Sequence, residues 1–344
     1  MSGKIRVLIV EDSLLMRRII ADIIKSDHDL EVVAEANDGE TALEKISRLK
    51  PDVVTLDINL PGINGLDVLS TIINKRSARV IMLSAYSRQG ASATIRALEL
   101  GAVDFIAKPS GEISPDLTDF KEDIISKIKL AAKIDPYKVE HSGSGVLDEV
   151  KGKAAFVNKV VVIGASTGGP KAVLEVMQRI SHNLPASFLI VQHMPLGFTL
   201  NFAERISWKS GIKTKEAEDG DIIAANRAFV APGGSNMILE NYQGQTIVRL
   251  DKKEIVDFIT PSIDKTMFSA AEIFGKNVIG VILTGMCKDG LEGARRIKEK
   301  GGSVIVQDEK TSVVWGMPKA VYKAGLADKV LPLSDIAQAI VEGV

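Results

Sequence analysis

The sequence predicts two α/β domains in tandem, each built on a mostly parallel sheet with helices on both faces. Three observations support this prediction. Short apolar runs alternate with amphipathic helical segments along most of the chain, a pattern typical of parallel sheets. The chain has 344 residues, which suits two domains at roughly 150 residues each. The alternation lapses once, so we place the first domain at residues 1–134, a linker at 135–158 and the second domain at 159–344.

The first domain contains five short apolar runs that predict strands, at residues 5–10, 31–34, 53–56, 80–83 and 103–106. Helical spacing of apolar residues follows the first and the last of these runs. In the first helix we expect the buried face to consist of Leu15, Ile19, Ile20, Ile23 and Ile24. In the last helix the predicted buried face is Phe120, Ile124, Ile128 and Ala131.

The linker and the second domain differ sharply in pattern. The linker contains Pro136, the stretch Gly143-Ser144-Gly145 and mixed charges, which is typical of a flexible connector, with a short helix possible at 146–150. Predicted strands of the second domain lie at 160–163, 188–191, 228–230, 278–283 and 303–306. Predicted helices lie at 169–180, 198–208, 262–274, 290–300 and 317–324, with another after Leu333. Residues 236–250 alternate around Gly244 and predict a hairpin.

The composition excludes several classes of protein. Apolar residues make up 45% of the chain and charged residues 25%, which indicates packed cores rather than disorder. Lys and Arg number 43 against 44 Asp and Glu, so the chain lacks the broad positive charge of a nucleic-acid-binding protein. The single cysteine, Cys287, excludes an internal disulfide and a cysteine-cluster zinc site. No apolar run approaches a membrane span of roughly 18 residues, and the first run ends at Glu11-Asp12, unlike a signal peptide. We therefore expect a soluble, cytoplasmic protein without membrane insertion.

Charged and hydroxyl side chains stand at the ends of four predicted strands of the first domain. Glu11 and Asp12 follow the first strand, Asp57 the third, Ser84 the fourth and Lys108 the fifth. In a sheet of order 2-1-3-4-5 the three acids converge, and Mg²⁺ is the cation that suits such oxygen ligands. A carboxylate, Mg²⁺, a hydroxyl and an ammonium can together accept a phosphoryl group. Each residue taken alone is equally well explained as a turn residue, a helix cap or a surface residue. Their occurrence together, each at the end of the expected strand, favours a phosphorylation site.

Residues 4–133 resemble the receiver domains of two-component response regulators, which have a flavodoxin-like fold. The resemblance rests on these strand-end residues and on the stretch Asp104-Phe105-Ile106-Ala107-Lys108-Pro109. It implies that Asp57 accepts a phosphoryl group from a histidine kinase, and that Mg²⁺ is held by Glu11, Asp12 and Asp57. It further implies that Ser84 and Lys108 contact the phosphoryl group and that Phe105 takes part in the switch. Because Phe105 has no hydroxyl, that switch must operate through packing.

The first strand of the second domain runs into the glycine-rich stretch Gly164-Ala165-Ser166-Thr167-Gly168-Gly169. One interpretation is a phosphate cradle of a dinucleotide-binding fold, which predicts an acidic residue at the end of the next strand. That strand ends at Gln192-His193 instead. The other interpretation is a nucleophile elbow of the form G-x-S-x-G, centred on Ser166. The pattern is weak when it stands alone.

A serine nucleophile needs a base, and the base needs an orienting acid. His193 ends the next strand, and Asp289 follows the apolar strand at 278–283. Considered separately, His193 is explained equally well as a capped or surface imidazole, and Asp289 as the N-cap of a helix. Three catalytic residue types at three strand ends of one sheet favour a serine hydrolase with the chain order Ser, His, Asp.

The whole chain resembles the CheB family of chemotaxis protein-glutamate methylesterases. The resemblance rests on residues 164–169, on Gln192-His193-Met194-Pro195, on residues 231–234 and on the loop at 286–290. It implies hydrolysis of glutamate methyl esters on methyl-accepting chemoreceptors, with deamidation of receptor glutamines, as the adaptation step of bacterial chemotaxis. The phosphodonor would be the chemotaxis histidine kinase. Because a connector of about 24 residues joins the two domains, we separately hypothesise that the unphosphorylated receiver covers the strand-end face carrying Ser166 and that phosphorylation of Asp57 loosens this contact.

For the ester chemistry the resemblance implies no cofactor. It implies that Ser166 is the nucleophile, that His193 is the base and then the acid, and that Asp289 orients His193. Backbone N–H groups near Thr167 and Met286 would form the oxyanion hole.

One position departs from the family pattern, because Cys287 stands where a second glycine is usual. Cys287 and Thr167 are alternative nucleophiles, but the elbow pattern centres on Ser166, and a lone cysteine most often acts as a small apolar residue.

Two rival functions belong to other classes. One is a nucleotide-binding module that uses residues 164–169. The other is a DNA-binding response regulator, for which a short basic helix-turn-helix domain would be expected.

Overall fold

A computed structural model of the chain describes residues 3–85, 87–109, 116–134, 157, 159–180, 184–251 and 260–344. The chain divides into two compact units, Met1–Glu140 and His141–Val344. The division falls within the segment predicted as the linker. Apart from residue 157, that segment lies outside the described residues, as does the short helix predicted at 146–150.

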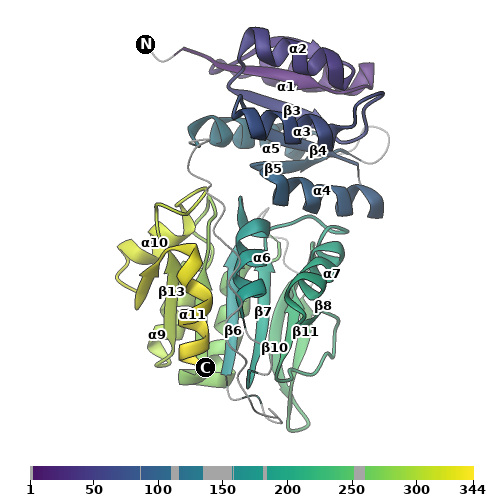
Figure 1. Cartoon of the computed structure of the whole chain (residues 1–344). Helices are drawn as coiled ribbons and strands as arrows, with labels where there is room; N and C mark the ends of the chain where they lie inside the picture. The colour runs from purple at the N-terminus through teal and green to yellow at the C-terminus, as the bar shows by residue number, and fades with distance from the viewer. Residues whose placement is uncertain are drawn as a thin grey trace. The chain divides into compact units, whose positions relative to one another are not determined.

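The first unit is a five-stranded parallel sheet with the order β2-β1-β3-β4-β5 (Figure 1). Its strands are β1 (Ile5–Val10), β2 (Leu30–Ala36), β3 (Val53–Asp57), β4 (Arg79–Ser84) and β5 (Asp104–Ala107). Its helices are α1 (Leu14–Lys25), α2 (Gly39–Leu49), α3 (Gly65–Lys75), α4 (Arg88–Leu100) and α5 (Asp116–Lys133). Helix α1 contacts α5, whereas α3 contacts both α2 and α4. The predicted fold and strand order are confirmed.

The buried faces of two helices test the predicted core of this unit. In α5 all four predicted side chains are buried, as expected. In α1 the prediction fails at Leu15, whose exposed fraction is 69%, while Ile20, Ile23 and Ile24 are buried. Leu15 lies in the first turn of α1, two residues after the cap Ser13. The buried face of the helix consists of Ile20, Ala21, Ile23 and Ile24, which turns Leu15 toward water. Apolar residues spaced three and four apart are compatible with more than one buried face of the helix. Packing against the sheet decides which face is buried.

The second unit contains a seven-stranded parallel sheet and an antiparallel hairpin. The sheet order is β14-β13-β12-β6-β7-β9-β8. Its strands are β6 (Lys159–Ala165), β7 (Ala186–Gln192), β8 (Lys213–Glu216), β9 (Arg227–Val230), β12 (Val278–Ile282), β13 (Ser303–Gln307) and β14 (Lys329–Leu331). The hairpin pairs β10 (Asn236–Tyr242) with β11 (Gln245–Asp251), as predicted around Gly244.

The helices of the second unit follow the predicted segments closely. They are α6 (Gly169–Arg179), α7 (Thr199–Ser210), α8 (Ile263–Phe274), α9 (Leu291–Glu299), α10 (Met317–Lys323) and α11 (Leu333–Gly343), with a 3₁₀ turn η1 at Gly275–Asn277. Among the helices of the described residues, none is long and apolar enough to span a membrane.

Two strands of the sheet, β8 and β14, were not predicted. Both lie at the edges of the sheet, and both begin with an exposed lysine, Lys213 and Lys329. Short, charged edge strands are common because they discourage pairing with another chain. They carry no continuous apolar run, so a pattern search misses them.

The sheet order brings the predicted catalytic residues to one edge. Strand β6 lies between β12 and β7 in the middle of the sheet. Because the three strands are parallel, their carboxyl ends lie together, and Ser166, His193 and Asp289 all follow those ends. Ligands of open α/β sheets bind beyond this edge.

Candidate functional sites

The three predicted acids of the first unit meet at the carboxyl edge of its sheet. Strand β1 pairs with β3, which places Glu11 and Asp12 beside Asp57. One carboxylate oxygen of each residue lies within 4.8 Å of the others. Glu11 and Asp57 are buried, whereas Asp12 is exposed. This donor set fits a hard divalent cation, because all its ligands are oxygens and one side remains open to water.

Lys108 joins this acidic site from the end of β5. Its Nζ lies 2.7 Å from Glu11 Oε2 and 2.8 Å from Asp57 Oδ2. Burial lowers the pKa of Lys108, but hydrogen bonds to both carboxylates outweigh that effect and raise the pKa. Burial raises the pKa of Glu11, and the Lys108 ammonium offsets only part of the increase. The acidic site therefore favours additional positive charge.

The two remaining predicted residues of the first unit are held by neighbouring helices. The hydroxyl of Ser84 lies 2.6 Å from Thr94 Oγ1 of α4. Phe105 is buried, and its backbone carbonyl accepts a hydrogen bond of 2.6 Å from Lys127 Nζ of α5. The same ammonium lies 5.5 Å from the centre of the Phe105 ring. Phe105 is thus fixed in an inward position by packing and by charge.

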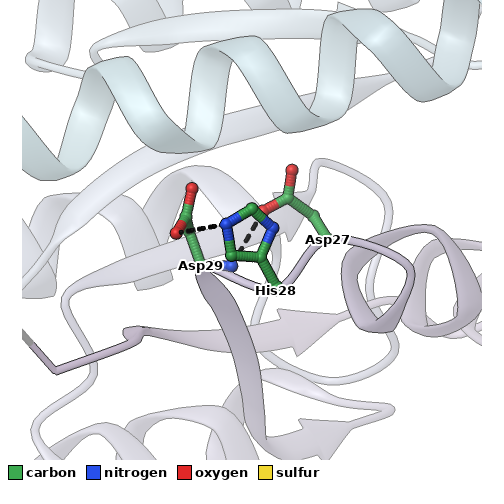
Figure 2. Close-up of side chains that lie close together, drawn as sticks. All are labelled: Asp27, His28 and Asp29. Carbon is green, nitrogen blue, oxygen red and sulfur yellow. Dashed lines mark hydrogen bonds and ion pairs between the residues drawn. The ribbon is translucent and has the colours of Figure 1, made fainter.

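A second group of possible metal ligands, Asp27, His28 and Asp29, lies at the end of α1 (Figure 2). Lys129 Nζ lies 2.8 Å from Asp27 Oδ2 and 2.7 Å from Asp29 Oδ2. Hydrogen bonds from Lys129 lower the pKa of both carboxyl groups. Because an ammonium already pairs with both acids, this cluster is a link between α1 and α5.

In the second unit, Ser166 lies on a tight turn between β6 and α6. Its backbone N–H donates to the carbonyl of Thr284 at 3.0 Å, and its own carbonyl accepts from Gly169 N at 2.7 Å. Gly168 closes the turn with a φ of +74°, in the left-handed region that favours glycine. This strand-turn-helix geometry is the context that a nucleophile elbow requires.

His193 contacts Asp289 across the sheet edge. The distance from His193 Nε2 to Asp289 Oδ2 is 2.8 Å. The other ring nitrogen, Nδ1, lies 3.9 Å from Cys287 Sγ. Within the part of the chain that the structure describes, the Ser166 hydroxyl makes no hydrogen bond. Since Nε2 faces Asp289, Nδ1 is the nitrogen left to serve a nucleophile, and catalytic contacts often shorten only when substrate is bound.

Asp289 also caps the helix α8. Its carboxylate accepts hydrogen bonds from the backbone N–H groups of Ile263 at 2.7 Å and Asp264 at 2.9 Å, and from Ser262 Oγ at 3.1 Å. Burial raises the pKa of Asp289, but the bond to His193 and these N–H donors outweigh it, so the pKa is lowered. The helix-cap interpretation is therefore confirmed, and the same carboxylate contacts His193 as the catalytic interpretation requires.

His193 is held in a charged environment. Burial of the ring lowers its pKa, but the hydrogen bond to Asp289 and the contact with Cys287 outweigh burial and raise the pKa to about 9. These contacts favour the protonated imidazole, and a base function requires the ring to lose that proton.

Comparisons with known proteins agree with this geometry. The family described as CheB methylesterase matches residues 161–340, which is more than half of the chain, and the response regulator receiver domain matches residues 7–114. The chain belongs to the CheB methylesterase family. A protein-glutamate methylesterase/protein-glutamine glutaminase of Pyrococcus abyssi is 45% identical over 345 residues, covering 99% of this chain and 94% of that protein.

Two comparisons with Thermotoga maritima agree with this family. A protein-glutamate methylesterase/protein-glutamine glutaminase of that organism is 43% identical to this chain and covers 98% of both chains. The solved structure of a Thermotoga maritima CheB methylesterase catalytic domain is similar with a TM-score of 0.53 and 43% identity, covering 54% of this chain and 98% of that domain.

Gln192 is a residue of the CheB site that the sequence did not mark as functional. It is buried, and its side-chain Nε2 donates to the backbone carbonyls of Ser166 at 3.0 Å and His193 at 3.1 Å. One amide therefore links the turn that carries Ser166 to the backbone of His193. The available signal was a polar residue in the last position of an otherwise apolar strand.

Asp264 and Thr284 are two further residues near this site that the sequence analysis did not identify. Burial first, and then the neighbouring Asp289, raise the pKa of Asp264 to about 7. Its carboxylate accepts from Gly293 N at 2.7 Å. The Thr284 hydroxyl donates to the Thr167 carbonyl at 2.9 Å and so fixes the residue after the nucleophile.

The predicted oxyanion donors of the CheB site lie on the two loops that flank Ser166. Thr167 is buried and held by Thr284, whereas Met286 has an exposed fraction of 53%. The two loops approach closely, since a Cβ added to Gly285 would lie 2.8 Å from Ser166 Cβ. In the described residues the Met286 N–H makes no hydrogen bond and remains available to a ligand.

Proposed function

We propose that this chain hydrolyses glutamate methyl esters, and deamidates glutamines, on methyl-accepting chemoreceptors in the cytoplasm. The observation that carries the proposal is the contact between His193 and Asp289 at the sheet edge that bears Ser166 on its tight turn. The printed names of relatives at 43–45% identity support the substrate class.

The ester reaction proceeds in two halves. Ser166 Oγ attacks the ester carbonyl while His193 Nδ1 takes the hydroxyl proton, and Asp289 stabilises the imidazolium through Nε2. The bond to the methoxy group breaks, His193 gives that oxygen its proton, and methanol leaves. Water then attacks the acyl-enzyme with His193 as base, which releases the glutamate side chain and restores the serine. A glutamine amide follows the same course and releases ammonia.

The negative oxygen that forms in each half needs hydrogen-bond donors. Backbone N–H groups of Thr167 and Met286 supply them in this proposal, and one such donor is typically worth ~3 kcal/mol of transition-state stabilisation. No cofactor takes part in the ester chemistry.

The first unit regulates the second through phosphorylation of Asp57 by the chemotaxis histidine kinase. Glu11, Asp12 and Asp57 would hold Mg²⁺, which neutralises phosphoryl charge when it is bound. Lys108 Nζ lies 2.8 Å from Asp57 Oδ2, and in this proposal it pairs with a phosphoryl oxygen. Ser84 supplies a hydroxyl donor to the same group, and Phe105 carries the packing change.

The dinucleotide-binding alternative receives little support from the site. It requires an acid at the end of β7 to bind a ribose. Gln192 occupies that position, and both of its N–H bonds are directed to backbone carbonyls.

The test is methanol release from methylated chemoreceptor membranes by the purified full chain, with and without a small acyl phosphate and Mg²⁺. We expect release to disappear in Ser166→Ala and the stimulation by the phosphodonor to disappear in Asp57→Asn. A folded protein that releases no methanol, beside a related methylesterase that does, would contradict the proposal.

A further inference from the structure

The hydroxyl of Ser84 is engaged with a buried hydroxyl of the neighbouring helix. Thr94 Oγ1 of α4 lies 2.6 Å from Ser84 Oγ, and both residues are fully buried. Ser84 directly follows Leu83, which pairs with Asp57 in the sheet. The hydroxyl proposed to contact the phosphoryl group thus has a partner in the unphosphorylated protein.

The direction of this hydrogen bond follows from counting protons. Thr94 Oγ1 also lies 2.7 Å from the Gly90 carbonyl, which can only accept. A hydroxyl has one proton to donate, so Thr94 donates to Gly90 and accepts from Ser84. The alternative acceptor for Ser84, the Ala85 carbonyl, is 3.4 Å away, a weak distance for a hydroxyl donor. The single proton of Ser84 is therefore directed to Thr94.

The helix that carries Thr94 is fixed against the segment after Ser84. A Cβ added to Gly90 would lie 2.4 Å from the Ala85 carbonyl oxygen, so α4 packs directly on this segment. Ser87 caps α4 by accepting a hydrogen bond of 3.0 Å from Gly90 N. These contacts hold the Thr94 hydroxyl, through α4, beside the segment that follows Ser84.

We propose that Thr94 is a positioning residue for receiver phosphorylation, which holds the Ser84 hydroxyl proton away from the phosphoryl group. The inference rests on the proposed function of Asp57. On phosphorylation, Ser84 redirects its proton from Thr94 Oγ1 to a phosphoryl oxygen, and Thr94 keeps its bond to Gly90. The bond between Ser84 and Thr94 stabilises only the unphosphorylated state, and one neutral hydrogen bond corresponds to about a fivefold change in equilibrium.

The experiment measures binding of beryllofluoride, an analogue of the phosphoryl group on aspartate, to the full chain by calorimetry with Mg²⁺ present. Thr94→Val removes the hydroxyl and keeps the shape, and we expect about fivefold tighter binding. Thr94→Ser restores the hydroxyl and should bind as the original chain does. Thr71→Val is the matched control, because Thr71 makes the same bond to a carbonyl four residues earlier, Asp67, at 3.0 Å.

A double-mutant cycle separates this role from a general loss of packing. In a Ser84→Ala background, Thr94→Val should leave the affinity unchanged, because no serine proton remains to be released. Thr94→Ala replaces Thr94→Val in the cycle if the valine variant fails to fold. With Ser84 present, unchanged or weaker binding by either variant overturns the inference, and so does a fivefold gain that persists in the Ser84→Ala background. If the original chain neither binds beryllofluoride nor accepts phosphate at Asp57, the proposed function of the first unit fails, and the inference fails with it.

Discussion

Asp289 makes two kinds of contact at this site. Its carboxylate lies 2.8 Å from His193 Nε2, and it accepts hydrogen bonds from the first backbone N–H groups of α8. The N–H groups of a helix start carry partial positive charge, so they keep the carboxylate ionised beside the imidazole. Catalytic geometry and helix stability are therefore coupled at this residue.

Asp289→Asn should reduce both activity and stability. We expect kcat for methanol release to fall about 10³–10⁴-fold, because the amide favours the wrong tautomer of His193. The free energy of unfolding in urea should fall by about 1 kcal/mol through the weaker cap. Ser166→Ala is the control, since it should abolish activity and leave unfolding unchanged. Full stability of Asp289→Asn would contradict the capping role.

The pH dependence of activity follows from the state of His193. Because its pKa is about 9 and the base form is the deprotonated one, kcat/KM should rise with pH and level off near that value. Contact with Cys287 contributes to the high pKa, so Cys287→Ala should move this rise to lower pH. The measurement is the pH profile of methanol release for both chains. Coincident profiles would exclude a role of Cys287.

The contribution of His193 to the free energy of unfolding should fall as the pH rises, whereas the activity should increase. The folded pKa of His193 lies above the ordinary value of 6.5, so the protonated ring stabilises the fold. This contribution is complete below about pH 6.5 and is lost as the pH rises through about 9. In urea unfolding, the advantage of the original chain over His193→Gln should shrink from about pH 6 to about pH 10. A stability difference between the two chains that does not change with pH would contradict a raised pKa of His193.

At the scale of elements, the turn between β6 and α6 depends on close packing as well as on a left-handed backbone. A Cβ added to Gly168 would lie 2.6 Å from Val313 Cβ. The φ of Gly168 adds a second obstacle to any side chain. The elbow is thus specified both by its own dihedral angles and by a loop more than a hundred residues away.

Gly168→Ala should destabilise the second unit by about 1–3 kcal/mol and reduce methanol release. The double variant Gly168→Ala with Val313→Gly should recover only part of the loss, because it removes the Val313 Cβ and leaves the unfavourable φ of residue 168. Urea unfolding followed by tryptophan fluorescence measures this, with Val313→Gly alone as the reference. Complete recovery would mean that the backbone conformation is unimportant.

The central elements were predictable, and the edge elements were not. Strands such as β6 and β12 are buried on both faces and appear as continuous apolar runs. The edge strand β8 has the sequence Lys-Thr-Lys-Glu and carries no such signal. The buried face of a helix was also ambiguous from the spacing of its apolar residues, since Leu15 of α1 was predicted to be buried and is exposed.

At the scale of the molecule, the two units have separate cores. One core, in the first unit, includes Ile128 of α5, and the other, in the second unit, includes Ile297 of α9. Both tryptophans, Trp208 and Trp315, belong to the second unit. Tryptophan fluorescence therefore follows unfolding of that unit, whereas circular dichroism follows both.

Ile128→Ala should destabilise the first unit alone. A cavity at a fully buried isoleucine typically lowers stability by about 2–5 kcal/mol. We expect an earlier transition in circular dichroism, with the fluorescence transition and the basal methanol release unchanged. Ile297→Ala is the matched control and should shift the fluorescence transition. Parallel shifts of both signals in Ile128→Ala would show that the units unfold together.

The alternation of strands and helices could be predicted from the sequence alone, and so could the positions of the candidate catalytic residues at strand ends. These features depend on local periodicity and turn chemistry, which a few neighbouring residues encode. The contacts that define the sites depended on the tertiary structure. His193 and Asp289 are 96 residues apart, and only the order β12-β6-β7 brings them together. The choice of Nε2 for Asp289, the capping of α8 and the bond from Ser84 to Thr94 were decided in the same way, because a side chain directs its hydrogen bonds to whichever groups the packed fold places beside it.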